Sequence, residues 1–137
     1  MAYDLAQLTY TPDMRHVDPA RGRIVCALRY CHVARSDGRY CARTLACHLG
    51  SRTAVASFHV LLDEAGHTWP ERIAVNPPCA PEFSYDEMLL ADLCMAAAYD
   101  DRLDFDEMVE DMLGPSARHA LWCAARRLMR ILVGTPQ

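Results

Sequence analysis

The 137-residue chain is 52% hydrophobic and 23% charged, a composition that indicates a packed core and excludes an intrinsically disordered protein. All fourteen basic residues are arginine, so mechanisms that need a lysine, such as Schiff-base formation and P-loop phosphate binding, are excluded. The net charge of −4 argues against broad nucleic-acid binding.

Membrane insertion and secretion are not expected either. No apolar run approaches the roughly eighteen residues that a membrane-spanning helix needs. The first residues, Met1 to Leu5, lack the basic and apolar regions of a signal peptide. We therefore expect a cytoplasmic protein whose seven cysteines are thiols.

Charge is divided into three blocks along the chain. Residues 1–62 hold eight arginines and four aspartates, and residues 112–137 hold four arginines and no acid. Between them, residues 63–111 hold fourteen of the eighteen acids and two arginines. The blocks therefore carry net charges of +4, +4 and −12 respectively. This division predicts an electrostatically self-complementary fold or assembly.

The N-terminal part of the chain predicts an arm followed by three helices. Asp18 and Pro19 are typical of the N-cap and first position of a helix. Gly50 is typical of the residue that ends one. The predicted ranges are 1–17 for the arm, then 19–34, 39–49 and 51–66 for the helices, with a turn at 36–38.

Residues 67–83 have no helical period and contain four prolines. Seventeen residues is long for a loop in a compact domain, so this connector is predicted to pack as an ordered strap. Trp69, Ile73, Val75 and Phe83 supply apolar anchors for it.

The C-terminal part predicts three more helices. Ser84 to Glu87 form a capping box that opens a helix ending near Ala98, and Asp104 to Glu107 form a second box that opens a helix to 113. Gly114 and Pro115 start a last helix, 115–133. The whole chain is thus predicted to be one all-α domain, a compact bundle of five or six helices. Its parts are the arm 1–17, the N-terminal helices 18–66, the Pro-rich connector 67–83 and the C-terminal helices 84–133.

Four cysteines fall on the first predicted helical hairpin. Facing residues of such a hairpin have numbers with a constant sum, which pairs Cys26 with Cys47 and Cys31 with Cys41. We interpret them as small buried thiols in the hairpin core. Two disulfides or a metal site are the alternatives. One metal site is disfavoured because Cys26 and Cys31 point in different directions on a helix.

Histidine gives no catalytic or metal signature. Cys31-His32 and Cys47-His48 are adjacent in sequence, but a catalytic dyad requires closeness in space, which sequence does not establish. His16, His67 and His119 have no partner at ligand spacing, and His59 could share a face with His48 only if Gly50 does not bend the helix axis. We therefore assign no catalytic, cofactor-binding or metal-binding residue and expect no cofactor.

The last predicted helix carries arginines mainly on the side away from its apolar stripe. We expect them to pair with acids of the middle block or of a second subunit, rather than with nucleic acid or a membrane surface. The candidate interaction surface consists of Arg118, Arg126, Arg127 and Arg130.

The stretch from Arg72 to Cys79, with Pro81 and the acidic capping box after it, is similar to a family of small uncharacterised helical bacterial proteins, a domain of unknown function. An Arg-rich helical first half is shared as well. In this chain Ala80 stands where a second cysteine is expected beside Cys79. Residues 86–113 also resemble TerB-like tellurite-resistance helical domains. These resemblances imply a helical fold, and the first implies no activity, ligand or site residue.

Amphipathic helices, segregated charge and the lack of a catalytic set favour a non-enzymatic protein–protein interaction or assembly module, for which a regulatory role is one option. The alternative is a small thiol- or metal-dependent protein, redox-responsive or enzymatic, that uses Cys and His. A protein partner or a homo-oligomer is expected, without nucleic acid or membrane.

Overall fold

The chain folds into α-helices joined by short turns and one long connector. The computed structural model describes residue 14 and residues 16–134, and in that part of the chain it contains six helices and no strand. The helices are α2 (Pro19–Asp37), α3 (Ala42–Leu49), α4 (Ala54–Thr68), α5 (Tyr85–Ala98), α6 (Arg102–Val109) and α7 (Pro115–Val133). The predicted all-α fold is confirmed. Most of the predicted arm, 1–17, lies outside the described residues.

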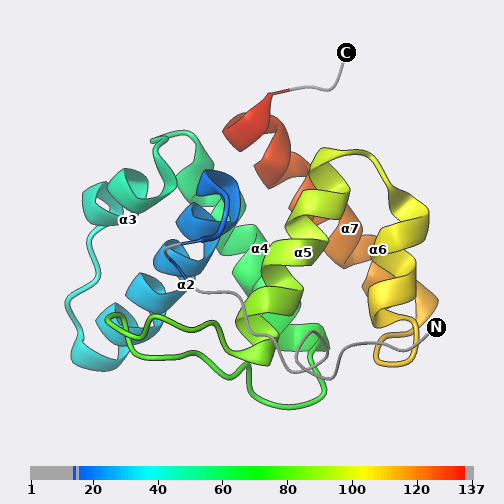
Figure 1. The fold of residues 1–137 in the computed structure, drawn as a ribbon, viewed down its shortest axis with the longest axis horizontal. Helices are drawn as coiled ribbons and strands as arrows, with labels where there is room; N and C mark the ends of the chain where they lie inside the picture. The colour runs from blue at the N-terminus through cyan, green and yellow to red at the C-terminus, as the bar shows by residue number, and fades with distance from the viewer. Residues whose placement is uncertain (1–13, 15, 135–137) are drawn as a thin grey trace.

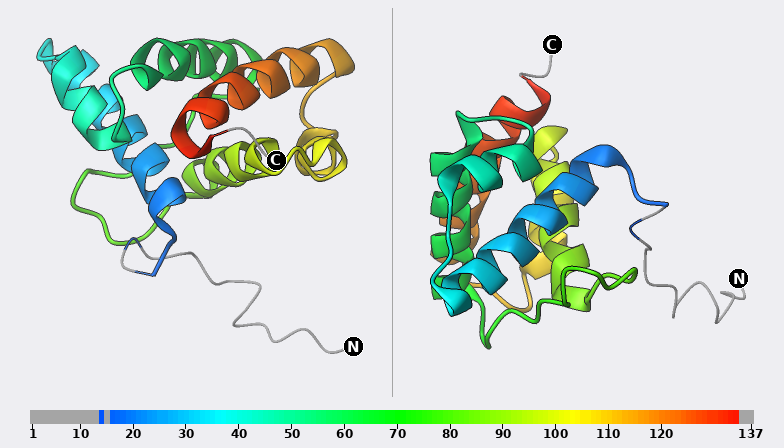
Figure 2. Two further views of the ribbon diagram at one scale, coloured as in Figure 1. Left: turned by 90° about the horizontal axis from the view of Figure 1, so that it is seen from above. Right: turned by 90° about the vertical axis from the view of Figure 1, so that its left-hand side faces the viewer.

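The helices are arranged around α5, which is buried on nearly all sides. α7 packs against both α4 and α5, and α2 packs against α3 and α5 (Figures 1 and 2). α3 and α6 lie at opposite ends of the molecule (Figure 1). None of the helices described is both long and apolar enough to cross a membrane.

Several helix ends follow the predicted local signals. The Asp18 carboxylate accepts a hydrogen bond from the backbone N–H of Arg21 at 3.2 Å and so caps α2. Gly50 ends α3 in the left-handed conformation, at a φ of 73°, where an L side chain would be strained. Ser84 and Glu87 form the predicted capping box of α5.

Four helices differ from their predicted bounds. α3 starts at Ala42 rather than 39, α4 spans Ala54–Thr68 rather than 51–66, and α6 ends at Val109 rather than 113. α2 continues through Ser36 and Asp37, because the residue that ends it is Gly38, at a left-handed φ of 66°. α6 starts at Arg102 rather than 104, because Asp101 instead of Asp104 is the N-cap. Its side chain accepts from the backbone N–H of Asp104 at 3.0 Å.

The connector between α4 and α5 has no regular secondary structure, but hydrogen bonds fix it to the start of α5. Ala74 N–H donates to the Asp86 carboxylate at 2.7 Å, and the Ser84 hydroxyl donates to the Ala74 carbonyl at 2.6 Å. Trp69 and Phe83, one at each end, are buried. The connector is therefore packed, as its apolar residues predict.

A buried ion pair joins α2 to the connector and α5. Arg29 of α2 donates from Nε to Glu87 Oε2 at 2.8 Å and from Nη2 to Glu87 Oε1 at 3.0 Å. Arg29 is 2% exposed and Glu87 is fully buried. Two further Arg29 N–H groups donate to backbone carbonyls, Nη1 to Ala80 at 2.7 Å and Nη2 to Glu82 at 2.8 Å. The two buried charges therefore neutralise each other and are hydrogen-bonded inside the protein.

Ion pairs connect the three charge blocks within one chain. Besides Arg29–Glu87, Arg21 pairs with Asp92 at 3.0 Å, which joins α2 to α5. Arg126 of α7 pairs with Asp100, which follows α5. Each pair sets an arginine of a basic block against an acid of the middle block. The predicted self-complementarity is therefore realised in the fold itself.

Candidate functional site

The four arginines of the predicted interaction surface do not all lie together. Arg126, Arg127 and Arg130 line a groove on α7 with a volume of about 350 Å³. Arg118 is half-buried outside this groove, and its buried Nε has no hydrogen-bond partner among the described residues. The α7 groove is completed by three further side chains of the same helix, Trp122, Cys123 and Ile131.

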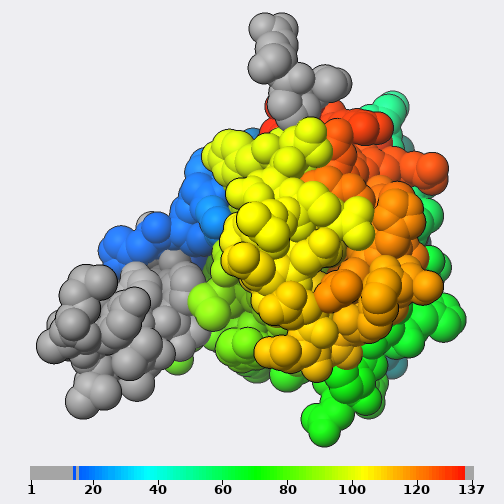
Figure 3. Space-filling model, turned by 90° about the vertical axis from the view of Figure 1, so that its right-hand side faces the viewer, coloured from blue at the N-terminus to red at the C-terminus, as the bar shows by residue number. Residues whose placement is uncertain are grey.

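Trp122 forms the rigid base of this surface. The guanidinium carbons of Arg102 and Arg126 lie 5.3 Å and 5.5 Å from the centre of its ring. The ring also packs edge to face on Phe105, with centroids 5.1 Å apart and planes at 78°. Cation–π and aromatic contacts of this kind fix the indole in one orientation. α6 and the first half of α7 lie together on the face shown in Figure 3.

Both arginines beside Trp122 are held by acids. Arg102 donates from Nε to Asp106 at 3.0 Å, an i, i+4 pair on α6. Arg126 pairs with Asp100, whose backbone is left-handed at a φ of 58°. Aspartate tolerates this conformation better than most residues. Asp100 and Asp106 therefore position Arg126 and Arg102 against the indole.

A cysteine and a histidine adjoin Trp122 but lack the arrangement of a catalytic dyad. His119 Nε2 lies 3.5 Å from Cys123 Sγ, and His119 Nδ1 lies 3.3 Å from Arg102 Nη1. Because arginine only donates, this contact favours the tautomer in which Nδ1 accepts and Nε2 carries the hydrogen. In that tautomer the nitrogen that faces the thiol has no free lone pair with which to act as its general base.

A second cluster around a histidine, formed by Tyr40, His59 and Arg35, lies away from the α7 groove. The Tyr40 hydroxyl is 2.6 Å from His59 Nε2, and Arg35 Nη2 is 3.3 Å from His59 Nδ1. The same donor logic places the hydrogen on Nε2, which then donates to Tyr40. Partial burial and the neighbouring Cys31 raise the pKa of Tyr40, so its phenol stays protonated at neutral pH. No activated base or nucleophile results.

The cysteines depart from their predicted environment. All seven are free thiols. Cys31 is buried and Cys26 half-buried, but Cys41 and Cys47 are exposed, so the interpretation of buried hairpin thiols is wrong for these two. The rule that pairs residues of constant sum assumes that both arms of the hairpin are regular helix over their whole length. Cys41 instead lies just before α3 as its N-cap, and Cys47 lies off the face of α3 that is buried.

Thiol environments differ accordingly. Complete burial raises the pKa of Cys94 to about 12. Burial also raises the pKa of Cys31. The backbone N–H and hydroxyl of Thr44 lower the pKa of exposed Cys41. Among the described residues, no three His, Cys, Asp or Glu side chains come together as metal ligands.

In comparisons with known proteins, no protein-family model, no curated protein and no solved structure matches the chain.

The residues of the candidate site that sequence reasoning missed are Arg102, Trp122 and Asp100. The i, i+4 spacing of Arg102 and Asp106 is a readable signal of their pairing. The contacts of Trp122 depend on how α6 packs against α7.

Proposed function

We propose that the protein is a non-enzymatic protein–protein interaction module and that the α7 groove is its binding surface. The observation that carries this proposal is the Trp122 indole set against Arg102 and Arg126, next to the exposed Arg127 and Arg130. Arginine is enriched in the energetic hot spots of protein interfaces, and Trp122, which is 9% exposed, supports these arginines from beneath.

Rigidity of the groove supports this function. Arg126 is held by Asp100 and Trp122 before any partner arrives. An arginine that is already ordered loses less side-chain entropy on binding than a free one. Ile131 and Val133, exposed at the C-terminal end of α7, extend the groove with apolar surface. Such surface next to ordered polar groups is typical of binding sites.

Charge defines the kind of partner. The groove is lined by three arginines and no acid. A protein segment that presents carboxylates beside an apolar side chain complements it. Nucleic acid fits less well, because only three arginines line the groove and the protein as a whole is acidic.

Charge reversal tests the proposal. Arg127→Glu with Arg130→Glu should abolish capture of a specific set of proteins from the native host, because both arginines are exposed and make no ion pair among the described residues. Arg39→Glu with Arg43→Glu is the matched control. These arginines are also exposed, but Arg43 lies in α3 and Arg39 shortly before it, at the other end of the molecule. Proteins lost with the first pair and kept with the second are the partners.

Self-association of the same variants is measured separately, by sedimentation equilibrium of the purified proteins. A dimer that the first pair of substitutions dissociates and the second leaves intact identifies a second copy of the chain as the partner. If both double variants capture the same proteins as the parent and sediment as the parent does, the α7 groove is not an interaction surface.

A further inference from the structure

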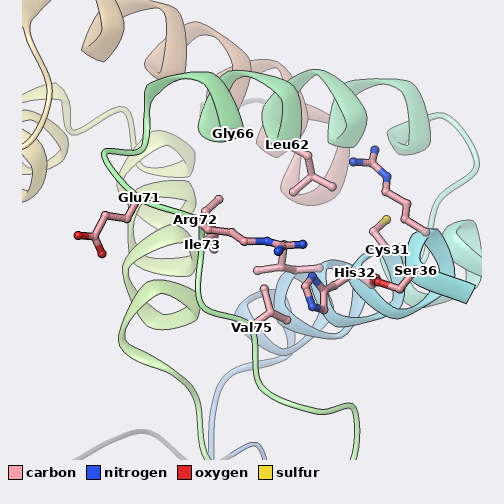
Figure 4. Close-up of a pocket in the computed structure, with 11 residues that line it drawn as sticks. Cys31, His32, Ser36, Leu62, Gly66, Glu71, Arg72, Ile73 and Val75 are labelled. Atoms are coloured by element: carbon pink, nitrogen blue, oxygen red, sulfur yellow. The ribbon is translucent and has the colours of Figure 1, made fainter.

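A second hollow, distinct from the α7 groove, lies between α2, α4 and the connector. Its volume is about 290 Å³ (Figure 4). Leu28 of α2 and Leu62 of α4 supply apolar walls, and Ile73 and Val75 of the connector supply the others. A water molecule, which has one non-hydrogen atom, takes up about 30 Å³ in the liquid, so the hollow has room for roughly ten non-hydrogen atoms.

The mouth of this α2–α4 hollow is positively charged. Arg72 extends its side chain across it toward His32 and Cys31, while the Glu71 carboxylate points away (Figure 4). Arg35 also lines it. Among the described residues, neither Arg35 nor Arg72 takes part in a salt bridge. The Arg72 guanidinium therefore faces the opening without a carboxylate to neutralise it, while the Arg35 guanidinium lies against His59, with Nη2 3.3 Å from Nδ1.

The connector holds its side of the hollow in place through an alternating pattern. Ile73 and Val75 line the hollow, while the backbone N–H groups of Ala74 and Asn76 form hydrogen bonds to side chains of α5. Ala74 N–H donates to Asp86 at 2.7 Å, and Asn76 N–H donates to Glu87 at 3.2 Å. Successive residues of an extended segment point to opposite sides, so these two bonds aim Ile73 and Val75 at the hollow.

The interior is apolar and uncharged. Leu28 and Leu62 are buried, and Cys31 is 2% exposed. Burial raises the pKa of the Cys31 thiol, which keeps it neutral at physiological pH. An apolar interior beneath the unpaired guanidinium of Arg72 suits a ligand with a hydrocarbon part and one anionic group.

We propose that the α2–α4 hollow binds a small organic carboxylate, with its hydrocarbon part against Leu62 and Ile73 and its carboxylate on Arg72. Arginine binds carboxylates through two parallel N–H donors, a geometry that the planar guanidinium provides. A saturated carboxylate with eight carbons has roughly ten non-hydrogen atoms and matches the volume.

Isothermal titration with octanoate tests this site. One octanoate should bind per chain, and Arg72→Gln should weaken binding about tenfold or more, the usual effect of losing a charged hydrogen bond. Arg39→Gln, an exposed arginine outside the hollow, should leave the affinity unchanged. Octanamide, which has the same shape without the charge, should bind at least about tenfold more weakly than octanoate.

Gly66→Leu tests the location without threatening the fold. Gly66 lines the hollow on α4, and a Cβ added there meets no atom within 4 Å. The substitution should therefore keep the thermal midpoint while blocking octanoate. The proposal is overturned if octanoate does not saturate the protein or if octanamide binds equally well. It is also overturned if Arg72→Gln matches Arg39→Gln, or if Gly66→Leu retains full affinity.

Discussion

Arg29 and Glu87 meet at two points inside the protein, 58 residues apart in the chain. The Glu87 carboxylate accepts four hydrogen bonds, from Nε and Nη2 of Arg29 and from the backbone N–H groups of Asn76 and Ser84. One side chain therefore caps α5, holds the connector and receives α2. Such a pair contributes specificity of packing more than net stability, but its disruption leaves an uncompensated charge.

Replacing Glu87 with Gln should destabilise the protein by about 3–5 kcal/mol, because Arg29 stays charged and buried without its counter-ion. Chemical denaturation measures this change in the free energy of unfolding. Glu82→Gln is the matched control, because the Glu82 side chain is exposed and only its carbonyl contacts Arg29. Adding Arg29→Met to Glu87→Gln should recover part of the loss. A cost for Glu87→Gln no larger than that of Glu82→Gln would contradict a structural role for the pair.

Replacing Ser84 with Ala should loosen the connector and cost about 1–2 kcal/mol, typical of losing an N-cap. The Ser84 hydroxyl accepts from Glu87 N–H at 3.0 Å and donates to the Ala74 carbonyl at 2.6 Å, and both bonds disappear. Trypsin should then cut after exposed Arg72 faster than in the parent, as followed by mass spectrometry. Ser84→Thr, which keeps the hydroxyl, is the control. Equal cleavage of parent and Ser84→Ala would show that this cap does not hold the connector.

Removing charges from α7 should separate stability from binding. Arg126→Gln should lower the free energy of unfolding by about 0.5–1 kcal/mol, more at low salt, because it breaks the contacts with Asp100 and Trp122. Arg127→Gln and Arg130→Gln should stay within about 0.5 kcal/mol of the parent, since both are exposed. Urea denaturation at two salt concentrations measures all three variants. Equal losses at the three positions would contradict the special place of Arg126.

The seven thiols should react with iodoacetamide in a definite order. Only the thiolate reacts, so at a given pH the lowered pKa of Cys41 gives it a larger reactive fraction than an ordinary exposed thiol. Cys41 should therefore be alkylated ahead of exposed Cys47 and Cys79, and as pH is raised its rate should begin to increase at a lower pH than theirs. Cys94, with its pKa raised to about 12 and its side chain buried, should react only on unfolding.

Peptide mass spectrometry over a pH series gives the rate at each cysteine. Thr44→Val removes the hydroxyl that stabilises the Cys41 thiolate, so it should shift the Cys41 profile to higher pH. A Cys41 profile that coincides with those of Cys47 and Cys79 in the parent would contradict the lowered pKa.

Sequence reasoning succeeds where a structural signal is local. Asp18, Gly50 and Ser84 mark helix ends through bonds to residues within five positions, so the sequence around them contains the whole interaction. It fails at α6, where Asp101 and Asp104 are both suitable caps and tertiary packing selects the first. Arg29 gives no sign of burial, because its partner lies on another helix and two carbonyls of the connector complete its shell.

The candidate site divides in the same way. Helical spacing alone puts Arg126, Arg127 and Arg130 on one side of the last helix, and the structure does bring these three together. Arg118 falls outside the groove because it lies eight residues, about two helical turns, before Arg126 on α7. The contact between Arg102 and Trp122 requires the α6–α7 packing, which no local pattern encodes.

The shared carboxylate of Glu87 also limits how the chain can evolve. Aspartate is one methylene shorter and does not span the same four donors, while glutamine introduces an N–H where donors already converge. Positions 29 and 87 are therefore expected to be inherited together or lost together. In descendants of this protein, an apolar residue at one of them should accompany an apolar residue at the other, and single replacements should be rare.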